Sequence, residues 1–182
     1  MSLAHALLTA LVERSCSGSD LAQRFDRSIG YFWPATHQQI YRELARLERE
    51  GWVTSEAVEA APGRRRIYSV LAAGREELER WVAEPREPKA IKDELLVKLR
   101  AAAALGGAGL VDTLRLRLER HRTKLATYHE IERRSFATAS PSREERLQRL
   151  ILQAGIDLEE LWIRLCEEGL AIVDGETRRP AA

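Results

Sequence analysis

The spacing of apolar residues changes near residue 52, and this change constrains the fold of the first half of the chain more than any other feature. Before residue 52, apolar residues recur every three to four positions within short segments, as they do on one face of a helix. After it, residues 52–59 and 65–70 have the composition of strands, and Pro62-Gly63 between them predicts a turn. The sequence therefore predicts helices first and then a hairpin with a basic returning strand.

Three helices are predicted before the hairpin, over 3–13, about 18–29 and about 36–50. The third carries the clearest start signal, because Thr36 with Gln39 at the third helical position forms a capping box. Gly51 marks its end. Three short helices within about 50 residues, joined by tight breaks, predict a helix-turn-helix, and the hairpin would be its wing.

The second start signal is Ser17 followed by Asp20, which resembles a capping box for the helix from about residue 18. Residues 15–19 are interpreted as an interruption between the first two helices. Leu21, Phe25 and Ile29 would form the buried row of the second helix.

The remainder of the chain is predicted to be helical. A helix over 72–83 closes the first unit, and two prolines within 84–88 exclude a helix there. Further helices are predicted over 90–105, 110–136 and 143–172. The last has a heptad seam sustained for almost three repeats, which predicts a homodimer interface. Its residues are Leu147, Ile151, Ala154, Leu158, Leu161 and Leu165.

The predicted fold class is mainly α. An N-terminal winged helix-turn-helix with a two-stranded β-wing would occupy 1–84, and a linker 85–89. An all-helical dimerisation region would occupy 90–173, and a disordered tail 174–182.

Composition excludes several classes of protein. The net charge is only +1, and 25 of the 29 basic residues are Arg, so a DNA interaction has to be argued from where the charges lie. The two cysteines are far apart, and the four histidines are scattered without ligand spacing, so neither a metal nor any other cofactor is predicted. No apolar run approaches the ~18 residues of a membrane span, and the N-terminus lacks the features of a secretory signal, so we expect a cytoplasmic protein without a membrane partner.

The third helix has a distinctive outer face. At 100° per residue, Ile40, Leu44 and Leu47 define a buried stripe. Gln and Arg residues with the small Ala45 lie opposite this stripe, while the glutamates lie on the flanks. Arg reads guanine and Gln reads adenine in the major groove, and a small residue permits close approach. The face therefore predicts sequence-specific binding to double-stranded DNA.

The arginines at the tip and on the returning strand of the hairpin, 64–66, are placed to meet the DNA backbone or minor groove. Tyr41 lies at the rim of the outer face, where its hydroxyl could reach a phosphate. The complete set of predicted DNA contacts is Thr36, His37, Gln38, Gln39, Tyr41, Arg42, Arg46, Arg49, Arg64, Arg65 and Arg66.

These stretches resemble the PadR family of transcriptional regulators, and the match covers essentially the whole winged-helix half. The stretches that carry it are 31–41, 44–53, 65–69 and 73–78. The long helical second half is similar to the larger subgroup, whose C-terminal domain resembles that of virulence activators. The resemblance implies a homodimer on a palindromic operator, most often a repressor relieved by a small-molecule effector. Ser19 replaces the family's usual aromatic residue after Gly18, and Leu71 replaces its usual capping Thr.

Other interpretations compete with this one. The winged helix could be a scaffold and the heptad helix a protein-interaction module without specific DNA binding, which the near-neutral charge favours slightly. No nucleophile with a base and no phosphate loop indicates an enzyme, and the many glutamates are interpreted as solvated faces. His121 is predicted to be a satisfied interior or interface histidine, and Trp162 an interface anchor.

Overall fold

Two units make up the chain, Met1–Lys89 and Ala90–Ala182, and the boundary between them falls at the end of the segment 85–89 that the sequence predicts to be a linker. The computed structural model describes residues 3–27, 29–31, 33–57, 65–88, 90–136 and 141–177. Each unit has its own hydrophobic core. Among the described helices, none is long and apolar enough to cross a membrane.

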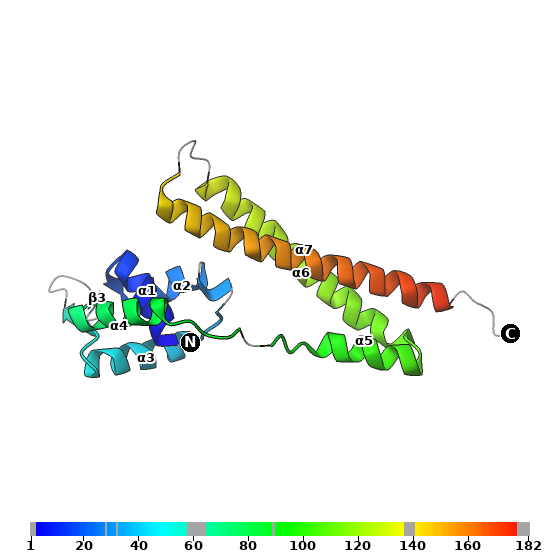
Figure 1. Cartoon of the computed structure of the whole chain (residues 1–182), viewed down its shortest axis with the longest axis horizontal. Coiled ribbons are helices and arrows are strands. Elements are labelled where there is room, and N and C mark those ends of the chain that lie inside the picture. The colour runs from blue at the N-terminus through cyan, green and yellow to red at the C-terminus, as the bar shows by residue number, and fades with distance from the viewer. Residues whose placement is uncertain are drawn as a thin grey trace. The chain divides into compact units, whose positions relative to one another are not determined.

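Four helices surround the core of the first unit (Figure 1). They are α1 (Leu3–Glu13), α2 (Gly18–Asp26), α3 (His37–Arg49) and α4 (Ala72–Ala83). A 3-10 turn, η1 (Ile29–Tyr31), follows α2. The side chains of Leu7, Phe25 and Leu44 are completely buried, so α1, α2 and α3 meet in one core. Burying each such side chain stabilises the fold by about 1.5–3 kcal/mol.

A small antiparallel sheet completes this unit. Strands β2 (Val53–Ala57) and β3 (Arg66–Val70) form the predicted hairpin, with Val53 opposite Val70 and Ala57 opposite Arg66. The strand order is β1-β3-β2, because β1 (Cys16–Ser17) pairs with the other edge of β3. The turn at 60–64 lies outside the described residues.

The sheet and α2 differ from the expectations. The segment around Ser17 was predicted to interrupt two helices, but it is a third strand; two residues are too few to show a period, and their partners are about 50 positions away. Helix α2 ends at Asp26, so Ile29 packs against the core from η1 and not from α2. Both expected caps are present: Ser17 accepts from the Asp20 amide, and Thr36 forms the capping box with Gln39.

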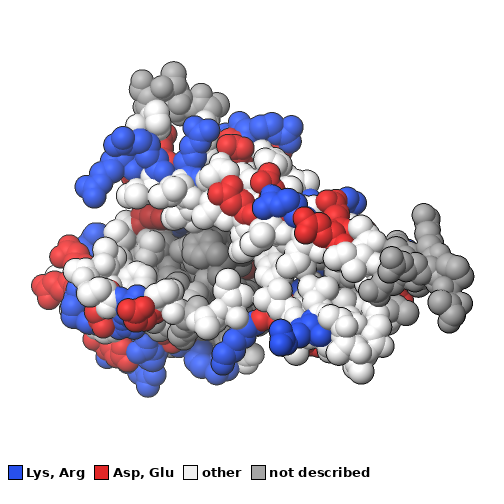
Figure 2. Space-filling view, turned by 45° about the vertical axis from the view of Figure 1, so that its right-hand side comes forward, with Lys and Arg blue, Asp and Glu red and all other residues white. Residues whose placement is uncertain are grey.

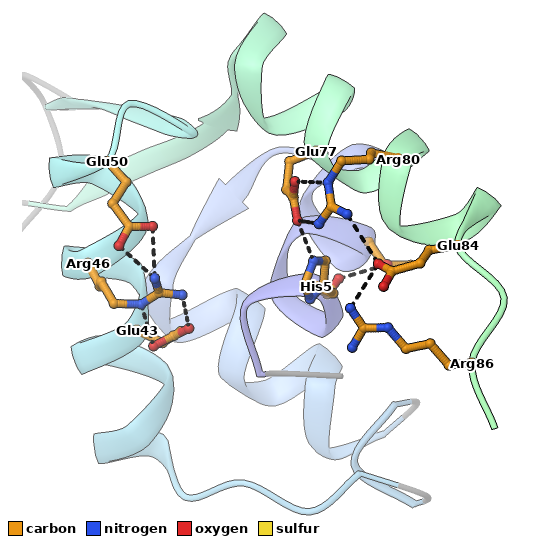
Figure 3. Close-up of polar contacts among 9 residues, drawn as sticks. His5, Glu43, Arg46, Glu50, Glu77, Arg80, Glu84 and Arg86 are labelled. Atoms are coloured by element: carbon orange, nitrogen blue, oxygen red, sulfur yellow. Dashed lines mark hydrogen bonds and ion pairs between the residues drawn. The ribbon is translucent and has the colours of Figure 1, made fainter. Parts of the chain in front are cut away.

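A polar network holds α4 against α1 (Figure 3). His5 Nε2 lies 3.0 Å from Glu77 Oε1, and Arg80 donates to the same carboxylate at 2.7 Å. Arg80 and then His5 lower the pKa of Glu77 to about 2. The His5 ring also stacks on Trp81, with 4.7 Å between the ring centroids. These contacts fix the orientation of α4 although its N-terminal residue Leu71 provides no side-chain cap.

The regular secondary structure of the second unit is entirely helical within its described residues. It contains α5 (Glu94–Leu105), the 3-10 turn η2 (Ala108–Leu110), α6 (Val111–Ser135) and α7 (Arg143–Thr177). Helices α6 and α7 lie side by side along much of their length (Figure 1). Leu95, Leu114 and Cys166 join α5, α6 and α7 in one buried cluster.

The ends of two helices differ from the sequence expectations. Helix α5 begins at Glu94, four residues later than predicted, because the Asp93 side chain accepts from the Leu95 amide at 2.8 Å and thereby caps the helix. Asp93 also binds Arg117 of α6, at 2.6 and 2.8 Å. Helix α7 runs to Thr177, so the first residues of the predicted tail, 174–177, are helical.

Candidate nucleic-acid interface

The rotation of α3 is fixed by three buried side chains. Ile40, Leu44 and Leu47 are each 0% exposed, as the 100° spacing predicts. The capping box sets where the helix begins: Gln39 donates its amide to Thr36 Oγ1 at 3.2 Å and accepts from the Thr36 amide at 2.8 Å. The side chains of Thr36 and Gln39 are therefore occupied by the cap, although both residues are exposed.

The outer face of α3 presents Gln38, Arg42, Ala45 and Arg49, all exposed. Within the described part of the chain, the side chains of Gln38 and Arg42 make no hydrogen bond or ion pair. The Arg49 side chain donates to the Ala45 carbonyl of its own helix, at 3.4 Å, and to no other group among the described residues. These side chains have their donors available for an external partner.

Arg46 differs from the other arginines of α3. Its guanidinium binds Glu43 at 2.6 Å on one side and Glu50 at 2.6 Å on the other, and it lies 5.9 Å from the centre of the Trp52 ring (Figure 3). The hydrogen bonds that Arg46 donates to Glu43 and then to Glu50 raise the pKa of Arg46. Arg46 is therefore not part of the acid-free outer face, which is narrower than predicted. Glu43, three residues before Arg46, and Glu50, four residues after it, both reach its guanidinium on the helix surface.

The N-terminal end of α3 is tied to α2. His37 Nε2 lies 2.8 Å from Asp26 Oδ2 at the end of α2, and both side chains are about half exposed. Tyr41 is 46% exposed, and its ring covers Gly18 at the start of α2. A Cβ at Gly18 would lie 2.6 Å from Tyr41 Cε1, so the absence of a side chain there allows the ring to take this position.

The predicted wing arginines lie against acidic groups. Arg65 forms an ion pair with Asp20 near the start of α2, and Arg66 binds Glu48 of α3 at 3.0 Å. The hydrogen bonds of Asp20 with Ser17 and then with Arg65 lower the pKa of Asp20. Arg64 lies outside the described residues. The sequence did not predict Asp20 and Glu48 as partners of Arg65 and Arg66, because these acids approach the hairpin only in the folded unit.

The surface charge agrees with the small net charge. On the face that Figure 2 shows, Lys and Arg lie among Asp and Glu, and not in one continuous basic patch. Among the described residues, no group of His, Cys, Asp or Glu could hold a metal ion. Any affinity for nucleic acid has to come from particular side chains such as those of α3.

The residues of the predicted dimer seam lie along one face of α7. Leu147, Ile151, Ala154, Leu158 and Leu161 are exposed. Leu165 is partly buried against the core of its own unit. A different row of α7 residues packs against α6 and α5, and it includes Ile156, Cys166 and Val173.

A buried ion-pair cluster joins α6 to α7. Glu159 is only 2% exposed; its carboxylate lies 2.5 Å from His121 Nδ1 and 2.8 Å from Lys124 Nζ. The interpretation of the glutamates as solvated is therefore wrong for Glu159, whose charge is offset by two partners. His121 is a satisfied interior histidine, as predicted. Trp162 stacks on it at 5.8 Å, and so this tryptophan contacts its own unit.

A capped, exposed helix that follows a helix and precedes a β-hairpin defines the class of winged-helix DNA-binding regulators. The model of the transcriptional regulator PadR-like family matches residues 7–80, and that of the virulence activator alpha C-terminal domain matches residues 91–174. The chain belongs to the PadR-like family of transcriptional regulators, which are not enzymes.

Relatives match along nearly the whole chain. The probable transcriptional regulator Rv1176c of Mycobacterium tuberculosis is 43% identical, over 92% of this chain and 95% of the relative. The virulence activator AphA of Vibrio cholerae superposes with a TM-score of 0.81 at 35% identity, over 96% of this chain and 99% of that one. PadR of Bacillus subtilis, solved with operator DNA, superposes with a TM-score of 0.79 at 26% identity, over 94% and 98%. It has also been solved with p-coumaric acid.

Proposed function

We propose that this chain binds a palindromic operator as a homodimer and places α3 in the major groove. The observation that carries the proposal is the outer face of α3, where the side chains of Gln38 and Arg42 are exposed and make no hydrogen bond or ion pair with the described residues. A protein scaffold has no need of such a face, whereas base edges accept from Arg and pair with Gln. The Bacillus relative's structure with operator DNA supports the same conclusion.

The remaining predicted contacts have different roles in this proposal. Thr36 and His37 lie at the N-terminal end of α3, where backbone amides favour a phosphate. Tyr41 and Arg49 are exposed beside the base-reading face and would contact the backbone of the DNA. A two-fold dimer presents one α3 from each protomer, so the half-sites should be about 10 base pairs apart or a multiple of that distance.

We further propose that the chain is a repressor relieved by a small molecule. The Bacillus relative is named a negative transcriptional regulator, and its structure with p-coumaric acid supports an effector of that general kind. A promoter–reporter assay with and without the protein gives the sign of regulation directly. Lower reporter output in the presence of the protein supports repression, and higher output contradicts it.

Fluorescence anisotropy tests DNA binding. Labelled DNA from the region upstream of the protein's own gene is compared with a scrambled duplex at about 0.15 M salt, where the phosphate contribution is damped. We expect tight binding to the native duplex only, with two protomers on each site. Equally weak binding to both duplexes would direct the same assay to other upstream regions of the genome. Failure on all of them would favour the scaffold.

Replacing Arg65 and Arg66 together by Ala should weaken binding to operator and scrambled duplex alike. Both side chains lie at the start of β3, next to the turn of the hairpin, where we expect them to reach phosphates and not bases. Removing two cations from phosphates should reduce the slope of log K against log salt by about 2. Titrations at several salt concentrations measure this slope, and an unchanged slope would remove these residues from the interface.

A further inference from the structure

Glu48, on the flank of α3, connects this helix to both strands of the hairpin. Its Oε1 atom accepts from the Ser55 hydroxyl of β2 at 2.5 Å and from the Arg66 guanidinium of β3 at 3.0 Å. Burial and then the charge of Glu48 raise the pKa of Tyr68 of β3. The Glu48 side chain is 33% exposed, so its carboxylate faces the hairpin more than the solvent.

The side chains that meet Glu48 lie on one face of the hairpin. Ser55 is paired with Tyr68, and Arg66 precedes Tyr68 by two residues, so all three side chains point to the same side. Arg65 binds Asp20 of α2 instead. The start of β3 is therefore held by an acid from each of two helices, and the contact with α3 is made through Glu48.

The guanidinium of Arg66 is held through one of its three nitrogens. Nη2 donates to Glu48 at 3.0 Å and to the Ser55 carbonyl oxygen at 3.2 Å. Toward the described residues, Nε and Nη1 donate no hydrogen bond, and the side chain is half exposed. Arg46 differs, since all three of its nitrogens donate to carboxylates of α3. Arg66 thus keeps donors for an external acceptor while its position is fixed.

We propose that Glu48 is a positioning residue for DNA binding, which holds the Arg66 guanidinium so that Nε and Nη1 meet a phosphate of the DNA backbone. This proposal rests on the proposed function and assigns a role within it. A long side chain that is free in solution has to be ordered when the complex forms, and this ordering lowers affinity roughly 2- to 12-fold. Glu48 removes that cost because it orders Arg66 beforehand.

The direction of the effect separates positioning from charge alone. A carboxylate near the phosphates opposes binding, so its removal should strengthen binding to every duplex if charge were its only influence. A carboxylate that competed with phosphate for Arg66 would act in the same direction. If Glu48 positions Arg66, its removal weakens binding instead. The loss should be equal on specific and scrambled DNA, because a phosphate contact carries no sequence information.

Anisotropy titrations of the full-length protein test the proposal with Glu48→Ala, Arg66→Ala and the double variant, on the native and the scrambled duplex. We expect Glu48→Ala to weaken binding to both duplexes by roughly two- to tenfold. In the Arg66→Ala background the same substitution should cause no further loss, because the side chain that it positions is absent. An equal loss in both backgrounds would overturn the proposal, and so would tighter binding by Glu48→Ala.

Two further variants of α3 complete the test. Glu48→Gln keeps an oxygen that can accept from Ser55 and Arg66, so it should bind both duplexes within about twofold of the wild type. Equal losses for Gln and Ala would contradict positioning by this oxygen. Glu50→Ala is the matched control, because it removes an acid of the same helix whose partner is Arg46 and not a wing arginine; it should not weaken binding.

Two readouts separate this proposal from the function on which it rests. Circular dichroism establishes that each variant is folded. A wild type that binds the native duplex, with no loss for Glu48→Ala, would overturn the role of Glu48 and leave the proposed function intact. A wild type that binds no duplex would contradict the proposed function and this proposal with it.

Discussion

Replacing Gly74 by Ala lowers the free energy of unfolding of the first unit by about 2 kcal/mol. Helix α4 passes so close to the start of the hairpin that a Cβ on Gly74 would lie 2.3 Å from the Trp52 carbonyl oxygen. That oxygen cannot retreat freely, because it accepts from the Leu71 amide at 2.9 Å. Overpacking of this kind costs about 1–3 kcal/mol or more, and exceeds the gain of about 1 kcal/mol in helix propensity.

Urea unfolding followed by tryptophan fluorescence measures this effect, since three of the four tryptophans lie in the first unit. Gly109→Ala is the matched control, because a Cβ there has nothing within 4 Å among the described residues and its φ is not in the left-handed region. Its unfolding midpoint should stay close to that of the wild type. If the two variants unfold at the same urea concentration, α4 does not approach the hairpin as closely as the structure shows.

Sequence patterns within a few residues of one another predicted most of the helices. The capping box at Thr36, the stripe of Ile40, Leu44 and Leu47, and the bounds of α1 and α4 all depend on residues within a few positions of one another. Such patterns can be read from one sequence because the energies that produce them are local. The outer face of α3 follows from the same stripe, so the exposure of Gln38 and Arg42 could be predicted as well.

Contacts between distant segments were not predictable in this way. The strand β1 pairs with residues about 50 positions away, and Arg65 finds Asp20 only after the hairpin has docked. The burial of Glu159 depends on two partners from α6, His121 and Lys124. It could not be recognised from the sequence, because other charged residues surround Glu159 along α7. The ion pairs of Arg46 are different, since Glu43 and Glu50 are its near neighbours on the same helix. They could have been predicted from the sequence, because oppositely charged side chains three or four residues apart on a helix are close enough to pair.

The two apolar rows of α7 show a further limit of sequence interpretation. The predicted seam is regular, and yet it is exposed, whereas the row interrupted by Glu159 and Cys166 is the one that packs within the chain. A uniformly apolar row can therefore lack a partner within the chain. The row that contains Glu159 can pack internally because His121 and Lys124 bind the Glu159 carboxylate. The free seam thus stays available for the proposed homodimer, which would set the spacing between the two α3 helices on DNA.

Arg42→Ala should lower affinity for the operator by about 1–3 kcal/mol, or roughly 5- to 150-fold, and reduce discrimination against a scrambled duplex. Its guanidinium is exposed on α3 and makes no hydrogen bond or ion pair with the described residues, so it can bind a guanine without losing an internal polar partner. Anisotropy titrations on both duplexes give the two affinities. An equal loss on both would make Arg42 a phosphate contact and contradict its assignment to the base-reading face.

Arg46→Ala is the matched comparison on the same helix. To reach a base, Arg46 would have to leave Glu43 and Glu50, and such charge-assisted pairs are worth more than neutral hydrogen bonds. We therefore expect its removal to change discrimination by less than about twofold, well below the lower limit for a base contact. Its effect should appear as a lower unfolding midpoint, because two carboxylates lose their shared cation and Trp52 loses its cover. A loss of discrimination as large as that of Arg42→Ala would mean that Arg46 leaves both carboxylates when DNA binds.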